Sequence, residues 1–208
     1  MQLDLYTAGK PVHEAKAAMV MVHGRGATAP SILELAFEFS QPEFAYFAPQ
    51  AAGNTWYPNS FLAPIESNEP GITNGLATIA TTIQQINDAG IPAEKIMILG
   101  FSQGACLSTE FVARHAARYG GIAALSGGLI GPDGTPRNYQ GVLDGTPVFL
   151  GCSDIDPHIP LKRVQESTQL LQKLGGSVTE RIYPGMGHTV NIDEIAFVRA
   201  MMSELIER

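Results

Sequence analysis

The sequence predicts a single α/β domain with one mostly parallel β-sheet and helices on both faces. Short apolar runs typical of buried strands alternate with segments of helical periodicity, which implies parallel pairing through right-handed crossovers. The chain has 208 residues, 45% of them hydrophobic, which suits one sizeable core over residues 1–208. A Gly-x-Ser-x-Gly pattern also lies between an apolar run and a helical segment, as expected where a strand turns into a helix.

The strands are assigned to short continuous apolar runs, the pattern of strands that are buried on both faces of a sheet. A more polar run at residues 3–6 is expected to form an edge strand. The other strands are expected at residues 17–22, 44–48, 96–99, 121–125, 147–151 and 177–183. Ligands of such a sheet bind at the carboxyl ends of its strands, so residues that follow these runs are the first candidates for a site.

The helices are assigned from apolar residues that recur three and four positions apart. They are expected at residues 31–39, 73–89, 103–117, 161–174 and 192–205. Ser31 is expected to cap the first of them, because Glu34 follows three positions later. Residues 131–146 are only a short loop that contains glycine and proline, so we expect no large cap domain.

A second irregular segment, residues 49–72, carries several prolines and four large apolar side chains. A long aromatic loop in a compact domain is usually functional. We expect Trp56 and Tyr57 to line the entrance of a site, whereas Phe61 and Leu62 are equally well explained as residues that pin the loop. The residues expected to bind substrate are His23, Gly24, Trp56 and Tyr57.

Ser102, at the centre of the Gly-x-Ser-x-Gly pattern, is the candidate nucleophile. Glycines two before and two after it allow the sharp bend that lifts a serine hydroxyl clear of the sheet. A chain with 22 glycines can contain this pattern by chance, but the flanking strand and helix supply the context that it requires. Cys106 and Cys152 lack such a turn and are better explained as small buried residues.

The serine hydroxyl needs a base to take its proton, and the base needs a carboxylate to fix its tautomer. His188 follows the last predicted strand and is the preferred base, with His158 as the alternative. Asp154 and Asp156 both follow the strand at residues 147–151, and either could reach a histidine. This kind of fold requires the order serine, acid, histidine, which Ser102, Asp156 and His188 satisfy.

Hydrolysis of an ester passes through an oxyanion, which two backbone N–H groups can stabilise. One donor is expected from Gln103, directly after the serine. The other is expected from Arg25, since Gly24 and Gly26 let the backbone turn its donors inward. A nucleotide-binding loop is the rival interpretation of these glycines, but the third glycine of its pattern would fall at Ala29.

Composition and charge disfavour several classes of function. A formal net charge of −7 argues against a phosphate-backbone partner, so no nucleic acid binding is expected. Two cysteines are too few for a disulfide framework and residues 1–10 do not resemble a signal peptide, so a cytoplasmic location is expected. No window approaches the length of a membrane helix, and no cluster has the spacing of metal ligands. We therefore expect no stable membrane insertion, no metal and no cofactor; a homodimer is compatible with the sequence.

The ordered motifs resemble the phospholipase/carboxylesterase family of α/β-hydrolases, which also contains acyl-protein thioesterases and small bacterial carboxylesterases. They are H-G-R-G-A at residues 23–27, Trp56, G-F-S-Q-G at 100–104, S-G-G at 126–128, D-P-H-I-P at 156–160 and G-M-G-H at 185–188. The resemblance covers nearly the whole chain and implies an α/β-hydrolase fold. It also implies these roles: Ser102 as nucleophile, Asp156 as acid, His188 as base, and Arg25 and Gln103 as backbone donors. Two departures bear on the substrate: Pro58 stands where many members have aspartate, and Arg25 replaces a residue that is often apolar.

The preferred interpretation is a serine carboxylesterase that hydrolyses small to medium carboxylic esters through an acyl-enzyme intermediate. Cleavage of acyl thioesters or lysophospholipids is a neighbouring activity of the same site. Two alternatives come from other classes: a protein that keeps this fold for binding without catalysis, and a flavodoxin-like or Rossmann nucleotide binder. The complete set of serine, acid and histidine argues against the first, and the missing glycine fingerprint argues against the second.

Overall fold

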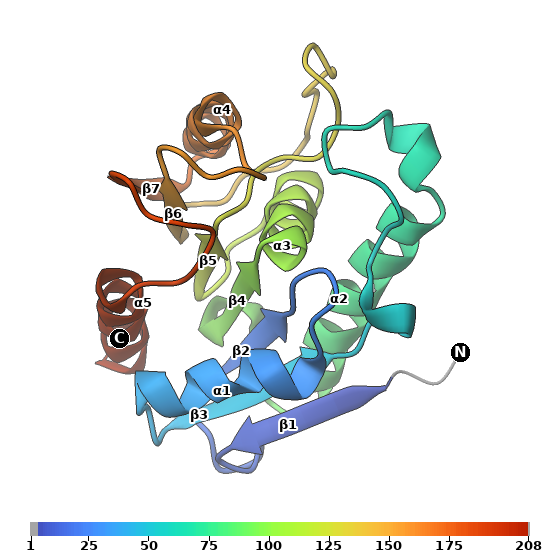
Figure 1. Cartoon of the computed structure of the whole chain (residues 1–208). Coiled ribbons are helices and arrows are strands. Elements are labelled where there is room, and N and C mark those ends of the chain that lie inside the picture. The colour runs from blue at the N-terminus through green and yellow to red at the C-terminus, as the bar shows by residue number, and fades with distance from the viewer. Residues whose placement is uncertain (1–3, 208) are drawn as a thin grey trace.

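The computed structural model describes residues 4–207, in which seven strands form one sheet (Figure 1). They are β1 (Leu5–Gly9), β2 (Ala17–Val22), β3 (Phe44–Pro49), β4 (Ile96–Phe101), β5 (Gly121–Leu125), β6 (Pro147–Ser153) and β7 (Ser177–Tyr183). The order across the sheet is β1-β3-β2-β4-β5-β6-β7. β1 pairs antiparallel with β3 and every other neighbouring pair is parallel, so the predicted mostly parallel sheet is confirmed.

Helices cover both faces of this sheet, as predicted (Figure 1). They are α1 (Ala29–Phe39), α2 (Gly71–Asp88), α3 (Gln103–Arg114), α4 (Leu161–Lys173) and α5 (Ile192–Glu207). The apolar sides of α2, α3 and α4 pack on one face, and those of α1 and α5 pack on the other. None of the helices in the described part of the chain has the length and hydrophobicity needed to cross a membrane.

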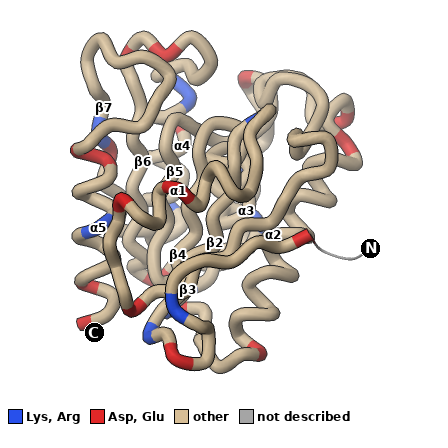
Figure 2. Tube along the Cα trace, turned by 60° about the horizontal axis from the view of Figure 1, so that its bottom comes forward, with Lys and Arg blue, Asp and Glu red and all other residues tan. Residues whose placement is uncertain are grey.

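Alternate side chains of β2 pack into the two hydrophobic cores on opposite faces of the sheet. Its six side chains are all fully buried. The even-numbered ones pack into the core under α2, α3 and α4, and the odd-numbered ones pack into the core under α1 and α5. The five inner strands of the sheet carry no charged residue, and neither does the edge strand β1. Figure 2 shows the acidic and basic residues on the surrounding helices and loops and on the other edge strand, β7.

The first helix begins earlier than predicted, and Ser31 is not its N-cap. Thr28 Oγ1 accepts the N–H of Ser31 at 3.3 Å, and Ser31 Oγ accepts the N–H of Thr28 at 3.1 Å. Ser31 thus takes the third helical position of a capping box, the role expected of Glu34. Pro30 lies in the first turn, where its fixed φ suits a helix and its missing N–H costs nothing.

The largest of the other boundary differences are at β1 and α3, and the remaining elements differ from their predicted ranges by two residues or fewer at either end. β1 is the expected edge strand, but its pairing with β3 begins at Leu5 and continues to Gly9, and Leu3 of the predicted segment lies outside the described residues. α3 ends at Arg114, three residues before the predicted end, because the next residues leave the helix and Ala116 forms an isolated bridge with Gly141. The segment between β5 and β6 is an irregular loop without a helix.

The parallel strands bring distant parts of the chain to one edge of the sheet. Arg25 follows β2, Ser102 follows β4, Asp156 follows β6 and His188 follows β7. β2, β4, β5, β6 and β7 run parallel to their neighbours, so their carboxyl ends lie on the same side. The fold therefore places these four residues close together.

Candidate active site

Ser102 lies in a tight turn between β4 and α3, with backbone angles of φ 55° and ψ −118°. A side chain rarely adopts this positive φ, so the surrounding packing must hold it. The two flanking glycines permit that packing: a Cβ on Gly104 would overlap the Val22 carbonyl, and a Cβ on Gly100 would overlap the backbone of Gly104. The Ser102 N–H donates to Leu125 O at 3.0 Å, which fixes the turn to the end of β5.

The Ser102 hydroxyl is joined to a histidine and a carboxylate by two hydrogen bonds. His188 Nε2 lies 2.8 Å from Ser102 Oγ, and His188 Nδ1 lies 2.7 Å from Asp156 Oδ2. The other carboxylate oxygen of Asp156 accepts the N–H groups of His158 at 2.8 Å and Ile159 at 3.0 Å. Burial by itself raises the pKa of Asp156, but the hydrogen bonds from His188 and these two N–H groups outweigh it and leave the pKa below its ordinary value.

The other aspartate and histidines that the sequence left as alternatives have different partners. Asp154 Oδ1 accepts the N–H of Gly185 at 2.8 Å, so this carboxylate orders the loop that carries His188. The ring of His158 lies edge-on to that of His188, 4.8 Å between centroids, and does not reach the serine through a hydrogen bond in the described structure. His13 pairs with Glu14 on the surface, and His115 packs on Phe111 beyond the end of α3.

Two backbone N–H groups flank Ser102. Gln103 is the first residue of α3, where an N–H has no partner within the helix. On the other side, the Arg25 N–H has no acceptor among residues 4–207, and the neighbouring Gly24 packs so closely that a Cβ on it would lie 3.4 Å from the Ser102 Cβ. The Arg25 side chain points into the long loop, where it donates to Thr55 Oγ1 at 3.1 Å and to Pro58 O at 2.9 Å.

A cavity of about 390 Å³ opens beside Ser102 and is large enough for a small ligand. Its apolar wall is formed mainly by Tyr57, Phe61, Phe101 and Ile159. Cys106 also lines it, but burial raises the pKa of this thiol to about 12, so the thiol remains protonated. The sequence analysis did not predict Ile159 as a lining residue. Its position in the segment directly after Asp156 could have indicated that it lies near the site.

Trp56 and His23 do not line this cavity, contrary to the expectation that both bind substrate. Trp56 is buried and donates from Nε1 to His23 O at 2.8 Å, and its ring lies 5.0 Å from the His23 ring. The fully buried His23 ring accepts the Ala51 N–H at Nε2, and burial lowers its pKa. The indole N–H of Trp56 and the ring nitrogen of His23 are both hydrogen-bonded within the domain, so the two residues attach the long loop to the end of β2. Gly24 and Tyr57 do line the cavity.

Phe61 and Leu62, for which the sequence favoured neither role, are separated by the structure. Phe61 lines the cavity beside Ser102. Leu62 faces a second hollow beside the start of α4, together with Pro132, Asp133, Pro160, Lys162 and Arg163. Among residues 4–207, no three His, Cys, Asp or Glu side chains gather closely enough to hold a metal ion.

Comparison with known proteins gives consistent matches. A model of the phospholipase/carboxylesterase family matches residues 7–206. A crystal structure of a phospholipase/carboxylesterase from Dyadobacter fermentans is 44% identical, covers 97% of each chain and superimposes with a TM-score of 0.93. A carboxylesterase from Bacillus cereus, 17% identical over 98% of this chain and 94% of its own, shares the fold with a TM-score of 0.75.

Among curated relatives, acyl-protein thioesterase 1 of Debaryomyces hansenii is 33% identical over 126 residues. This alignment covers 60% of the present chain but only 54% of the relative, so the chain matches about half of the length of that thioesterase.

Glu194 in the first turn of α5 holds the end of the loop that carries His188. Its Oε2 accepts the Asn191 N–H and Asn191 Oδ1 accepts the Glu194 N–H, both at 2.9 Å. The side chain is fully buried beside Gly151, and Oε1 has no hydrogen-bond partner in the described structure. Burial raises the pKa of Glu194 to about 7 from an ordinary value of 4.5.

Glu194→Gln is expected to stabilise the protein above neutral pH. Between pH 4.5 and about 7 the unfolded chain ionises this carboxyl while the folded chain does not, so folding stability is full below this window and falls as pH rises through it. The loss is on the order of 3 kcal/mol. Gln keeps the acceptor for Asn191 and cannot ionise.

Urea unfolding at pH 5 and pH 8 measures this difference. The stability gained by Glu194→Gln should be larger at pH 8, whereas Glu207→Gln on the exposed end of the same helix should show no such dependence. An equal effect of Glu194→Gln at both pH values would mean that Glu194 is already ionised in the folded protein.

Proposed function

The chain belongs to the phospholipase/carboxylesterase family of α/β-hydrolases. We propose that it is a serine carboxylesterase acting on small to medium carboxylic esters. One observation carries the proposal. The hydroxyl of Ser102, held at a strained strand-to-helix turn, hydrogen-bonds to a histidine that in turn hydrogen-bonds to a buried carboxylate, at the wall of a cavity of about 390 Å³.

The reaction proposed begins at the serine hydroxyl. Asp156 accepts the Nδ1–H of His188 and so leaves Nε2 free to take the Ser102 proton as Oγ attacks the ester carbonyl. The N–H groups of Arg25 and Gln103 stabilise the oxyanion of the tetrahedral intermediate. His188 then returns the proton to the departing alcohol, which leaves an acyl group on Ser102. Water activated by His188 releases the acid in the same sequence of steps.

The environment of the acid supports this assignment. Asp156 is buried, yet its hydrogen bonds keep the pKa below the ordinary value, so the carboxylate remains ionised at neutral pH and can stabilise an imidazolium at His188. Cys106, whose thiol also lines the cavity, has a pKa raised to about 12 by burial and lies outside the turn. Both observations favour Ser102 as the nucleophile.

Acyl thioester hydrolysis is the second candidate. It is favoured by the likeness to fungal acyl-protein thioesterases. The same acyl-enzyme would form at Ser102, and only the leaving group would change from an alcohol to a thiol. A series of p-nitrophenyl esters and matched acyl thioesters of equal acyl length distinguishes the two by their kcat/KM values.

Ser102→Ala is expected to reduce kcat on p-nitrophenyl butyrate by a factor on the order of 10⁴ or more, because no acyl-enzyme can form. Ser126→Ala is the matched control: it removes the hydroxyl of another serine with positive φ, 53°, at the end of β5, and most of the activity should remain. Thermal unfolding confirms that both variants fold. Wild-type protein inert to the whole ester series would support a binding protein without catalysis instead.

Asp156→Asn is expected to lower kcat by a factor on the order of 10⁴, because an amide cannot hold His188 in the required tautomer. Asp154→Asn should cost far less, since the amide oxygen can still accept the Gly185 N–H. Steady-state kinetics of the two variants on one ester makes the comparison. A reversed order of severity would show that the acid is misassigned.

A further inference from the structure

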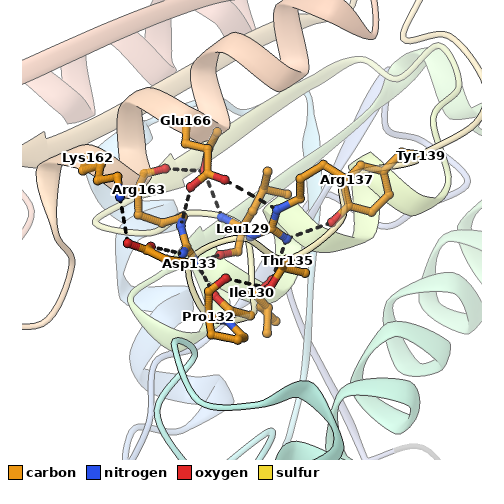
Figure 3. Close-up of polar contacts among 12 residues, drawn as sticks. Leu129, Ile130, Pro132, Asp133, Thr135, Arg137, Tyr139, Lys162, Arg163 and Glu166 are labelled. Carbon is orange, nitrogen blue, oxygen red and sulfur yellow. Dashed lines mark hydrogen bonds and ion pairs between the residues drawn. The ribbon is translucent and has the colours of Figure 1, made fainter.

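A buried network of charged side chains lies next to the cavity and takes no part in the steps above (Figure 3). Figure 3 labels three of its members: Arg137 from the loop after β5, and Arg163 with Glu166 from α4. The fourth member is Glu110 from α3, which pairs with Arg137. Arg163 and Glu110 expose only 2% and 1% of their side chains. Taking a charge out of water is costly, the attraction within an ion pair only offsets that cost, and packed apolar side chains often give equal stability. The network therefore calls for an explanation other than stability.

The guanidinium of Arg163 holds the loop after β5 from the side of α4. Its Nη1 donates to Leu129 O at 2.8 Å and to Gly131 O at 2.5 Å. Its Nη2 donates to Asp133 Oδ1 at 3.0 Å, and its Nε donates to Glu166 Oε2 at 2.9 Å. Four hydrogen bonds thus leave little freedom to either the guanidinium or the loop.

The same loop is held from the opposite side by the helix that follows Ser102. Glu110 Oε2 accepts the Ile130 N–H at 3.1 Å, and Glu110 Oε1 accepts the Tyr139 hydroxyl at 2.9 Å. Arg137 Nη1 donates to Ile130 O at 2.6 Å and lies 3.7 Å from Glu110 Oε2. Residues 129–131 are therefore held in place by hydrogen bonds from side chains of both α3 and α4.

The loop at residues 129–131 and Arg163 both contact Phe61, which is part of the wall of the cavity. The Gly131 N–H donates to Phe61 O at 2.7 Å, which fixes the backbone of the wall residue. The guanidinium carbon of Arg163 lies 5.9 Å from the centre of the Phe61 ring, close enough for a cation–π contact with the side chain. Phe61 lines the cavity, whereas Arg163 does not.

We propose that Arg163 is a positioning residue that fixes Phe61 and thereby sets the acyl length that the cavity accepts. The inference rests on the proposed esterase function. Without the guanidinium, the Phe61 ring loses its cation–π contact, and Gly131, which hydrogen-bonds to the Phe61 backbone, loses its bond to Arg163. The Phe61 side chain can then move aside for a longer acyl group. Short acyl groups do not reach the wall and gain nothing. The ratio of kcat/KM for octanoate to that for acetate therefore rises.

Arg163→Met and Arg163→Lys test the proposal with p-nitrophenyl esters from acetate to decanoate. Methionine keeps much of the aliphatic stem and removes the charge. The ratio of octanoate to acetate should rise roughly tenfold, the size of effect that one or two methylenes have in an apolar pocket. Lysine keeps the buried charge beside Glu166 but cannot donate to Leu129, Gly131 and Asp133 together, so a smaller rise in the same direction is expected even if the methionine variant folds poorly.

Lys162→Met is the matched control. Lys162 pairs with the same Asp133 at 2.7 Å, but its side chain is 76% exposed on the outer surface of α4, so its loss should leave the chain-length profile unchanged. In a Phe61→Ala background, Arg163→Met should cause little further change in the profile, because the residue through which it acts is gone.

An equal loss by Arg163→Met and Arg163→Lys at every acyl length would overturn the proposal and leave Arg163 a structural residue only. A full additional shift in the Phe61→Ala background would overturn it too, because Arg163 would then act by another route. Failure of the esterase function itself would be recognised separately, since the wild type would then hydrolyse none of the esters.

Discussion

The close packing of the β4–α3 turn against the end of β2 is the constraint on which the site depends. Backbone atoms occupy the space in which a Cβ on Gly100 or Gly104 would lie, so only glycine fits at these two positions. The turn between them must adopt a positive φ at Ser102, which lifts the hydroxyl out of the sheet and opens the first N–H of α3 toward it. Two features on which the proposed mechanism relies, the raised hydroxyl and the unpaired N–H, thus follow from one packing requirement.

The remaining groups reach this turn because parallel strands end on the same side of the sheet. The loop that carries His188 is hydrogen-bonded to the end of β6, where Ser153 donates to Met186 O, and to the loop after it, where Asp154 accepts the Gly185 N–H. At the other end of the loop, Glu194 accepts the Asn191 N–H. These hydrogen bonds position the loop, and the bond from His188 Nδ1 to Asp156 Oδ2 orients the ring of His188, the proposed base, toward Ser102.

Much of this architecture could be predicted from the sequence, because it depends on local patterns. The strands at residues 17–22, 121–125 and 177–183 were placed without error, since apolar runs and turn residues bound them clearly. The order of Ser102, Asp156 and His188 along the chain was equally readable. The function of Trp56 was not, because its indole N–H bonds to a carbonyl 33 positions away, a pairing that no local pattern reveals. The network around Arg163 was missed for the same reason: apart from Glu166, the partners of its guanidinium lie 30 to 34 positions away.

The central claim is that Ser102 becomes acylated, and intact mass spectrometry of the protein tests it most directly. The protein would be mixed with a p-nitrophenyl ester and quenched in acid within the first turnovers, and any adduct would be mapped by peptide sequencing. The account predicts a mass increase equal to one acyl group, located on Ser102 and nowhere else. An adduct on Cys106, or rapid hydrolysis without any adduct under conditions that slow deacylation, would contradict it.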